Sequence, residues 1–173
     1  MVTTPTVLSD FMIKLPPTAH VRVAEFTHGS PDLDAARLTA TPTHYEHVTG
    51  HRPTITLHHA ELGATPFGDE ALNGIWCARP PVFTSPEDAL GALRVFHRSL
   101  MGHGLLCLDA GHPDWQGIGT ADDVLTALGE TGFSFVRVRD EQGHRRVLAV
   151  KKLRCCESGR PFHDRRTVLR EFR

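Results

Sequence analysis

The chain has 173 residues, of which 40% are hydrophobic and 23% charged, and its formal net charge is −1. These values are typical of one globular domain with its own core, and the balanced charge excludes a global attraction for nucleic acid or an anionic membrane. No apolar run approaches the roughly 18 residues that a membrane span needs, and no signal peptide is expected.

Short apolar runs alternate with helical patterns along the chain. Before residue 20, the pattern predicts one short helix, with Ser9 or Asp10 as its N-cap and Pro16-Pro17 as its end. The strands predicted after it, before the terminal hairpin, are Val21–Phe26, Arg37–Ala40, Thr54–His59, Leu72–Cys77 and Gly104–Asp109.

Two helices and a hairpin follow from local signals. Ser85–Leu100 begins with a capping serine, a proline and two acids, and Thr120–Thr131 begins with a capping threonine. Alternating residues in "FSFVRVRDEQGHRRVLAV" predict two strands joined by a turn at Asp140–His144. Strands that alternate with helices and end in a hairpin predict an α/β domain with a mostly parallel sheet.

The last segment differs in composition from the rest. From Lys151 onward eight basic residues stand against three acidic ones. We therefore expect a domain over residues 1–152, whose first 20 residues form a short cap, and a basic extension over residues 153–173. Such an extension could contact phosphates or dock on another subunit, and its few aromatic residues favour docking over nucleic-acid binding.

Three phrases carry a family resemblance: "AELGATPFGDEALNGIW" (60–76), "HRSLMGHGLLCL" (97–108) and "ADDVLTALGETGFSFVRV" (121–138). In this order they resemble the small class I S-adenosylmethionine-dependent methyltransferases, which typically read A-D-L-x-x-L-P-F-x-D-x-x-F-D-G-I-W in the first of these regions. The resemblance implies a Rossmann-like sheet of seven strands in the order 3-2-1-4-5-7-6, mostly parallel, with a C-terminal antiparallel hairpin.

The same resemblance implies S-adenosylmethionine as cofactor. The family follows its first strand with a Glu/Asp-x-Gly-x-Gly-x-Gly loop; Glu25 and Gly29 match it, whereas Thr27 and Pro31 replace two glycines. A side chain at the first of these positions would crowd the amino-acid part of the cofactor. The residues that the resemblance gives to the cofactor are Glu25, Thr27, Gly29, Thr41, Glu61, Leu62 and Cys77.

Individual roles also follow from the family pattern. Thr41 stands where an acid takes the ribose hydroxyls, and Glu61 with Leu62 stands where the family contacts the adenine. Cys77–Pro81 and His103 would border the methyl acceptor. No catalytic base is predicted, because a sulfonium is already a strong electrophile and positioning supplies most of the rate.

The sequence leaves two hypotheses open for the function. One is methyl transfer from S-adenosylmethionine to an unidentified small-molecule or macromolecular acceptor. The alternative is a non-catalytic methyltransferase-like module with a degenerate cofactor site, acting with a protein partner. A short N-terminal cap also predicts a site that is open or completed by a second chain, as in a homo-oligomer or with a partner subunit.

The histidines and cysteines are candidates for separate sites. His44, His47 and His51 have helical spacing, but no acid or cysteine completes a zinc set, so we predict a solvated face and no metal. His58 and His59 are neighbours on a strand and must point to opposite faces. Four cysteines without a disulfide pattern favour a reducing compartment, the cytoplasm by default.

Overall fold

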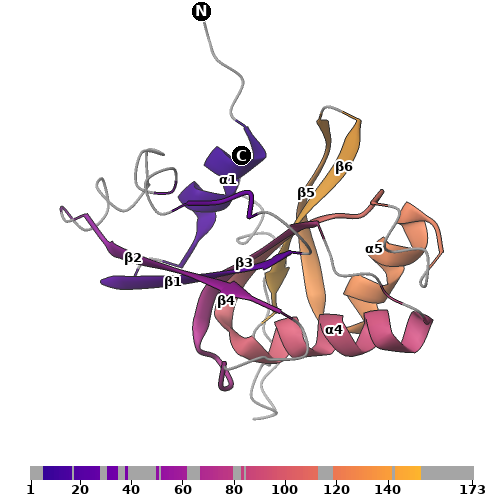
Figure 1. The fold of residues 1–173 in the computed structure, drawn as a ribbon, viewed down its shortest axis with the longest axis horizontal. Helices are drawn as coiled ribbons and strands as arrows, with labels where there is room; N and C mark the ends of the chain where they lie inside the picture. The colour runs from indigo at the N-terminus through magenta and orange to yellow at the C-terminus, as the bar shows by residue number, and fades with distance from the viewer. Residues whose placement is uncertain are drawn as a thin grey trace, which may run out of the picture.

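The computed structural model (Figure 1) describes residues 6–16, 18–27, 31–34, 38, 50, 52–61, 67–79, 83, 85–112, 119–141 and 143–152. In chain order the elements are α1 (Val7–Lys14), β1 (His20–Thr27), β2 (Thr54–Ala60), β3 (Leu72–Arg79), α4 (Pro86–Ser99), β4 (Leu100–Asp109), α5 (Ala121–Glu130), β5 (Phe133–Glu141) and β6 (His144–Lys151).

The described strands form one six-stranded sheet in the order β2-β1-β3-β4-β6-β5. The first four are mutually parallel, and β6 pairs antiparallel with both β4 and β5. The predicted fold class, an α/β sheet that is mostly parallel with a C-terminal antiparallel hairpin, is therefore confirmed. None of the described helices combines the length and the apolarity that a membrane crossing requires.

Local capping explains where the two longer helices begin. Ser85 accepts a hydrogen bond from the backbone N–H of Asp88 and precedes a proline at the first helical position. Thr120 and Asp123 form a capping box at the start of α5. Both helices lie on one side of the sheet, and α1 lies on the other (Figure 1).

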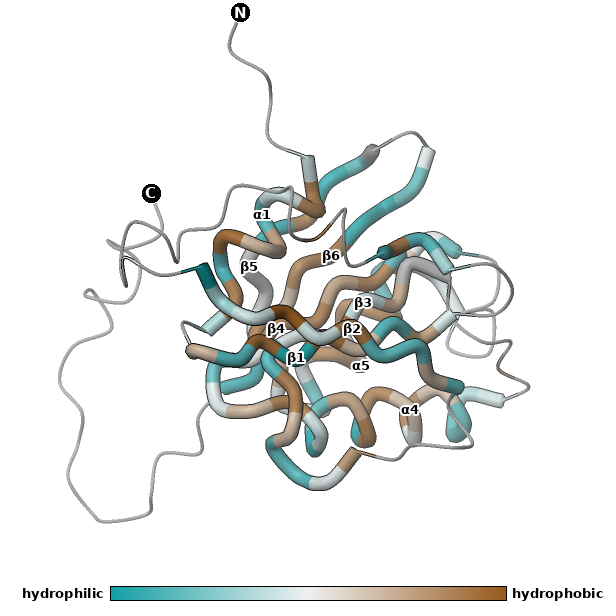
Figure 2. The backbone as a smooth tube through the Cα atoms, turned by 60° about the vertical axis from the view of Figure 1, so that its left-hand side comes forward, coloured by the Kyte–Doolittle hydropathy of each residue, from teal (hydrophilic) through white to brown (hydrophobic). Residues whose placement is uncertain are grey.

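Each face of the sheet has its own core. Phe26, Ile75 and Leu106 pack with the helices α4 and α5, whereas Val23, Trp76 and the residues of α1 pack on the opposite face. The inner strands are accordingly rich in hydrophobic residues, and the tip of the β5–β6 hairpin is hydrophilic (Figure 2). Alternate residues of each strand therefore serve two cores.

One close approach fixes α1 against the sheet. A Cβ atom added to Gly74 would lie 2.5 Å from Leu15 and 2.6 Å from Phe11, so only glycine leaves room for them. The ring of Phe11 meets Trp76 edge-on, with 5.4 Å between centroids. The absence of a side chain on β3 thus sets how closely the N-terminal helix packs.

Two predictions in the N-terminal part are wrong. The first helix begins after Thr6, whose hydroxyl accepts the N–H of Ser9, so neither Ser9 nor Asp10 is the N-cap. The strand predicted at 37–40 cannot lie between the neighbours β1 and β2, because these pair directly from His20 with Thr54 onward. Leu38 is helical instead, and its N–H bonds to the carbonyl of Asp34.

Candidate cofactor site at the carboxyl edge of the sheet

The parallel strands β1 to β4 end along one edge of the sheet. Glu25 near the end of β1 lies in register with His59 of β2 and with Trp76 of β3. The register between β1 and β3 shifts between Glu25 and Thr27, an irregularity of the kind that re-aims side chains next to functional sites. Ligands of open α/β sheets bind outside this edge.

Glu25 holds the loop that follows its own strand. Its carboxylate is buried and accepts hydrogen bonds from the backbone N–H of Asp32, at 2.6 Å, and of Leu33, at 3.1 Å. The ring nitrogen Nδ1 of His59 lies 3.2 Å from the other carboxylate oxygen. Burial raises the pKa of the Glu25 carboxyl, while these two amides and the His59 ring oppose the shift.

Two further side chains at this edge differ in their exposure to solvent. Thr27 ends β1, and its hydroxyl oxygen is buried without a hydrogen-bond partner among the described residues. Glu61 follows β2 directly and is exposed. A buried hydroxyl without a partner and an open carboxylate can both bond to a polar ligand.

A second carboxylate–histidine pair lies farther along the edge. Asp109, the last residue of β4, is buried and lies 2.5 Å from Nδ1 of His144, the first residue of β6. Its other oxygen accepts the N–H of Gly111 at 3.1 Å. Sequence reasoning missed this pair, although an aspartate directly after the apolar run "GLLCL" was a signal.

Neither protein-family models nor the sequences of curated proteins match this chain. Solved structures do. A methyltransferase from Methanosarcina mazei has a TM-score of 0.54 at 10% identity, with 79% of this chain and 94% of that chain covered. The magnesium protoporphyrin IX methyltransferase of Synechocystis PCC 6803, solved with S-adenosylmethionine, has 0.53 at 16%, with 77% and 71% covered.

A third match is a Haloferax volcanii methyltransferase complexed with an activator protein, at a TM-score of 0.54 and 10% identity, with 83% of this chain and 88% of that chain covered. S-adenosylmethionine-dependent methyltransferases from Aquifex aeolicus and Mesorhizobium loti are similar as well. The chain has a class I methyltransferase fold. A [4+2]-cyclase and a possible exported protein, of which this chain covers 66%, match too, so the methyltransferase fold alone does not fix the activity.

Two residues that were predicted to border the methyl acceptor, Cys77 and His103, do not lie in the open at the carboxyl edge of this methyltransferase fold. Cys77 is fully buried in the core beside α4, and burial raises the pKa of its thiol. His103 is exposed, but it lies near the amino end of β4, about 20 Å of strand from Asp109. That position excludes His103 from the carboxyl edge.

Asn73, where the family's Phe-Asp pair has its acid, is a structural residue. It accepts the backbone N–H of Arg22 at 2.9 Å and donates to the hydroxyl of Thr18 at 2.8 Å. These contacts lie at the amino end of the sheet, opposite the candidate site. The remaining predicted cofactor residues, Gly29, Thr41 and Leu62, lie outside the described residues, as do the predicted solvated face of His44, His47 and His51 and the basic extension.

Proposed function

We propose that the chain binds S-adenosylmethionine across the carboxyl edge of β1 and β2 and transfers its methyl group to an acceptor. The observation that carries this proposal is the arrangement at the end of β1. There the buried carboxylate of Glu25 orders the following loop through Asp32 and Leu33, on a methyltransferase fold. Ligands of open α/β sheets bind outside these strand ends, so residues 32 and 33 are held beside the place where a cofactor would lie.

The strand order changes the role that we assign to Glu61. The family resemblance gives the ribose hydroxyls to an acid at the end of the strand beside the first strand. In this chain the neighbour of β1 on the side away from β3 is β2, and the exposed Glu61 follows β2. We therefore assign the ribose to Glu61 in place of Thr41, because a carboxylate makes stronger, charge-assisted bonds to hydroxyls.

Thr27 and Glu25 would take different parts in holding the cofactor. The buried hydroxyl of Thr27 has no partner among the described residues, and it would hydrogen-bond the bound molecule. The Glu25 oxygens already serve Asp32, Leu33 and His59, so Glu25 acts as a positioning residue for the loop. Bound S-adenosylmethionine supplies an electrophilic methyl group, and the chain's task is to orient the acceptor in line with it and to exclude water.

Calorimetric titration with S-adenosylmethionine and S-adenosylhomocysteine tests the proposal. We expect saturable binding that Glu61→Gln weakens about 10-fold or more, the value of a charge-assisted hydrogen bond. Glu130→Gln, which changes an exposed glutamate at the end of α5, is the matched control and should leave the affinity unchanged. No heat and no thermal stabilisation at millimolar ligand would overturn the proposal, since a bound ligand must stabilise the folded chain.

Methyl transfer needs a separate measurement because the acceptor is unidentified. The chain is incubated with methyl-tritiated S-adenosylmethionine and a cell extract, and the label is followed into small-molecule and protein fractions. We expect label in one fraction with the unchanged chain and much less with Glu61→Gln. Cofactor binding without any labelled product would favour the second candidate function.

That second candidate is a binding or regulatory module that works with a protein partner. Two observations favour it: the Glu25 carboxylate is already occupied by protein groups, and one similar structure is a methyltransferase in complex with an activator protein. A partner, if captured, should raise the affinity for S-adenosylhomocysteine. The two described cysteines, Cys77 and Cys107, are buried and form no disulfide among the described residues, which supports a reducing compartment such as the cytoplasm.

A further inference from the structure

The pair of Asp109 and His144 holds an imidazole in one orientation at the carboxyl edge of the sheet. The Asp109 carboxylate is buried, and its oxygen Oδ2 lies 2.5 Å from Nδ1 of His144. An ionised carboxylate only accepts hydrogen bonds, so Nδ1 of the neutral ring carries the hydrogen and Nε2 keeps its lone pair. Nε2 has no hydrogen-bond partner among the described residues, and the His144 side chain is 49% exposed. The ring can therefore accept a proton from a bound molecule.

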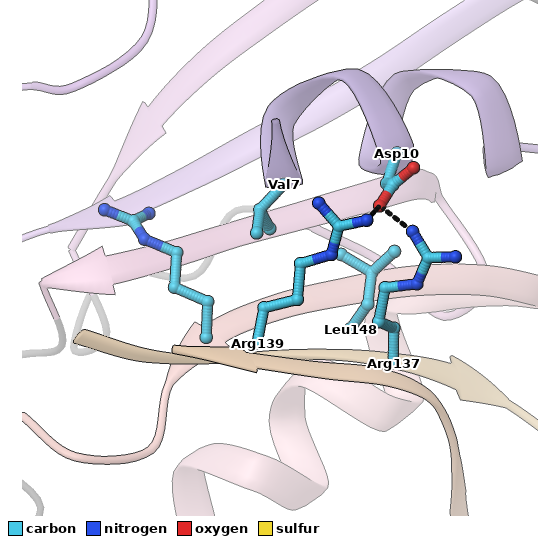
Figure 3. A pocket seen from close by; sticks show the side chains of 6 residues that line it. Val7, Asp10, Arg137, Arg139 and Leu148 are labelled. Carbon is cyan, nitrogen blue, oxygen red and sulfur yellow. Dashed lines mark hydrogen bonds and ion pairs between the residues drawn. The ribbon is translucent and has the colours of Figure 1, made fainter. Parts of the chain in front are cut away.

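The strand that carries His144 has support on both sides. β6 pairs with β4 on one side and with β5 on the other. Arg137 and Arg139 of β5 in turn contact the carboxylate of Asp10 in α1 (Figure 3). These contacts tie the hairpin to the rest of the domain, and a group on such a rigid element keeps the position that catalysis requires.

The pair lies on the side of the proposed cofactor site to which the methyl group would point. In the proposed function the ribose lies at the end of β2 and the amino-acid part at Thr27, so the cofactor runs from β2 toward β3 and β4. Glu25, Trp76 and Cys107 are register partners across β1, β3 and β4. Thr27 and Asp109, each two residues farther along, therefore end their strands at about the same level. Two strand spacings, roughly 10 Å, separate β1 from β4, which leaves room for a small acceptor.

We propose that His144 is the general base of the methyl transfer and that Asp109 is its positioning residue; this inference rests on the proposed function. An acceptor hydroxyl gives its proton to Nε2 of His144 while its oxygen attacks the methyl carbon of S-adenosylmethionine. The carbon–sulfur bond breaks, and its electron pair stays on the sulfur of S-adenosylhomocysteine. Asp109 stabilises the imidazolium that forms, and the exposed ring then passes the proton to water.

A base at this place indicates a hydroxyl compound as the acceptor. A thiol, with a pKa of about 8.5, is already partly ionised near neutral pH. An unprotonated amine attacks with its own lone pair and can lose a proton afterwards. A phenol, with a pKa of about 10, is mostly protonated and must lose its proton as the bond to carbon forms. We therefore expect a small hydroxyl compound, such as a phenol, to receive the methyl group.

Nitrogen-15 NMR of the histidine side chains tests the orientation of the ring without cofactor or acceptor. We expect the neutral ring of His144 to carry its hydrogen on Nδ1. Asp109→Asn, whose amide can donate to Nδ1, should move that hydrogen to Nε2. A neutral ring with its hydrogen on Nε2 in the unchanged chain overturns the proposal, because that nitrogen could not accept a proton.

The rate of methyl transfer tests what the ring does. The probe is methyl-tritiated S-adenosylmethionine with the cell extract, and the affinity for S-adenosylmethionine is measured in parallel by calorimetry. We expect His144→Gln to lower the labelling rate about 100-fold or more without changing this affinity, and Asp109→Asn to act in the same way. His20→Gln, which replaces an exposed histidine at the amino end of β1, is the matched control and should change neither quantity.

Failure of this inference differs from failure of the proposed function. No cofactor binding, or binding without any labelled product, overturns the proposed function and this inference with it. Labelling at an unchanged rate by His144→Gln overturns the role of His144 alone, as does a loss of rate that only follows a loss of affinity. Label on the oxygen of a small molecule supports the proposed acceptor, whereas label on sulfur or nitrogen overturns it while methyl transfer stands.

Discussion

The carboxyl edge of the sheet contains two carboxylate–histidine pairs that are equally exposed to solvent but differ in their contacts. In each pair the acid side chain is 1% exposed and the histidine 49% exposed. Glu25 bonds first to the backbone of its loop and meets His59 at 3.2 Å, whereas Asp109 meets His144 at 2.5 Å. The acid therefore orders a loop in one pair and orients an imidazole in the other.

Removing the Glu25 carboxylate should lower the free energy of unfolding most. Glu25→Ala leaves the N–H groups of Asp32 and Leu33 without their acceptor, and Leu33 is buried. We expect the free energy of unfolding to fall by about 3 kcal/mol, from roughly 1–3 kcal/mol per buried unsatisfied donor. Urea unfolding followed by circular dichroism measures it. A loss below about 1 kcal/mol would mean that the loop does not depend on Glu25.

Removing the second acid should cost less. Asp109→Ala frees the N–H of Gly111, which is exposed and can bond to water, and leaves His144 half exposed. We expect a loss of about 1.5 kcal/mol in the same unfolding experiment. If Asp109→Ala proved as costly as Glu25→Ala, the distinction between a loop-ordering and an imidazole-orienting acid would fail.

The contribution of Glu25 to the free energy of unfolding should depend on pH. Burial raises the folded-state pKa of this carboxyl above its ordinary value of 4.5, so the folded chain binds its proton more tightly than the unfolded chain. The extra free energy of unfolding that the unchanged chain has over Glu25→Gln is therefore largest below about pH 4.5. It declines as the pH rises through the folded-state pKa. Unfolding titrations of both proteins from pH 4 to pH 8 should show this difference shrinking; a growing difference contradicts the shift.

Replacing His59 or His144 should lower the free energy of unfolding least. Both rings are half exposed, and ion pairs at the surface contribute little. We expect His144→Gln to lower the free energy of unfolding by about 0.5–1 kcal/mol and His59→Gln by less than about 0.5 kcal/mol. Thermal melts at one pH are sufficient for the ranking. A larger effect at His59 would reverse the comparison.

Local signals in the sequence were sufficient for most elements. The cap at Ser85 and the alternation around the Asp140–His144 turn place α4 and the hairpin to within a few residues. The sequence also predicted that His58 and His59 face opposite sides. His58 meets the ring of Phe67 at 5.4 Å, and His59 meets Glu25.

Local sequence signals could not predict which strands pair with one another in the sheet. Periodicity indicates that a strand exists but not which strand lies beside it, so the direct pairing of β1 with β2 and the place of Glu61 next to it were missed. The occupancy of Glu25 by its own loop depends on backbone geometry. The contact of Arg137 and Arg139 with Asp10 had a usable signal, because these two arginines alternate on one strand and must share a face.

The salt bridge between Asp10 and Arg137 joins residues 127 positions apart in the chain, and this spacing sets a waiting time during synthesis. A ribosome that adds about 5–20 residues per second needs roughly 6–25 s to make the strands on which α1 packs. Phe11 and Met12, both fully buried in the folded chain, reach their final burial only when the last of these strands has been made. Until then, α1 lacks part of the surface that covers it in the folded chain.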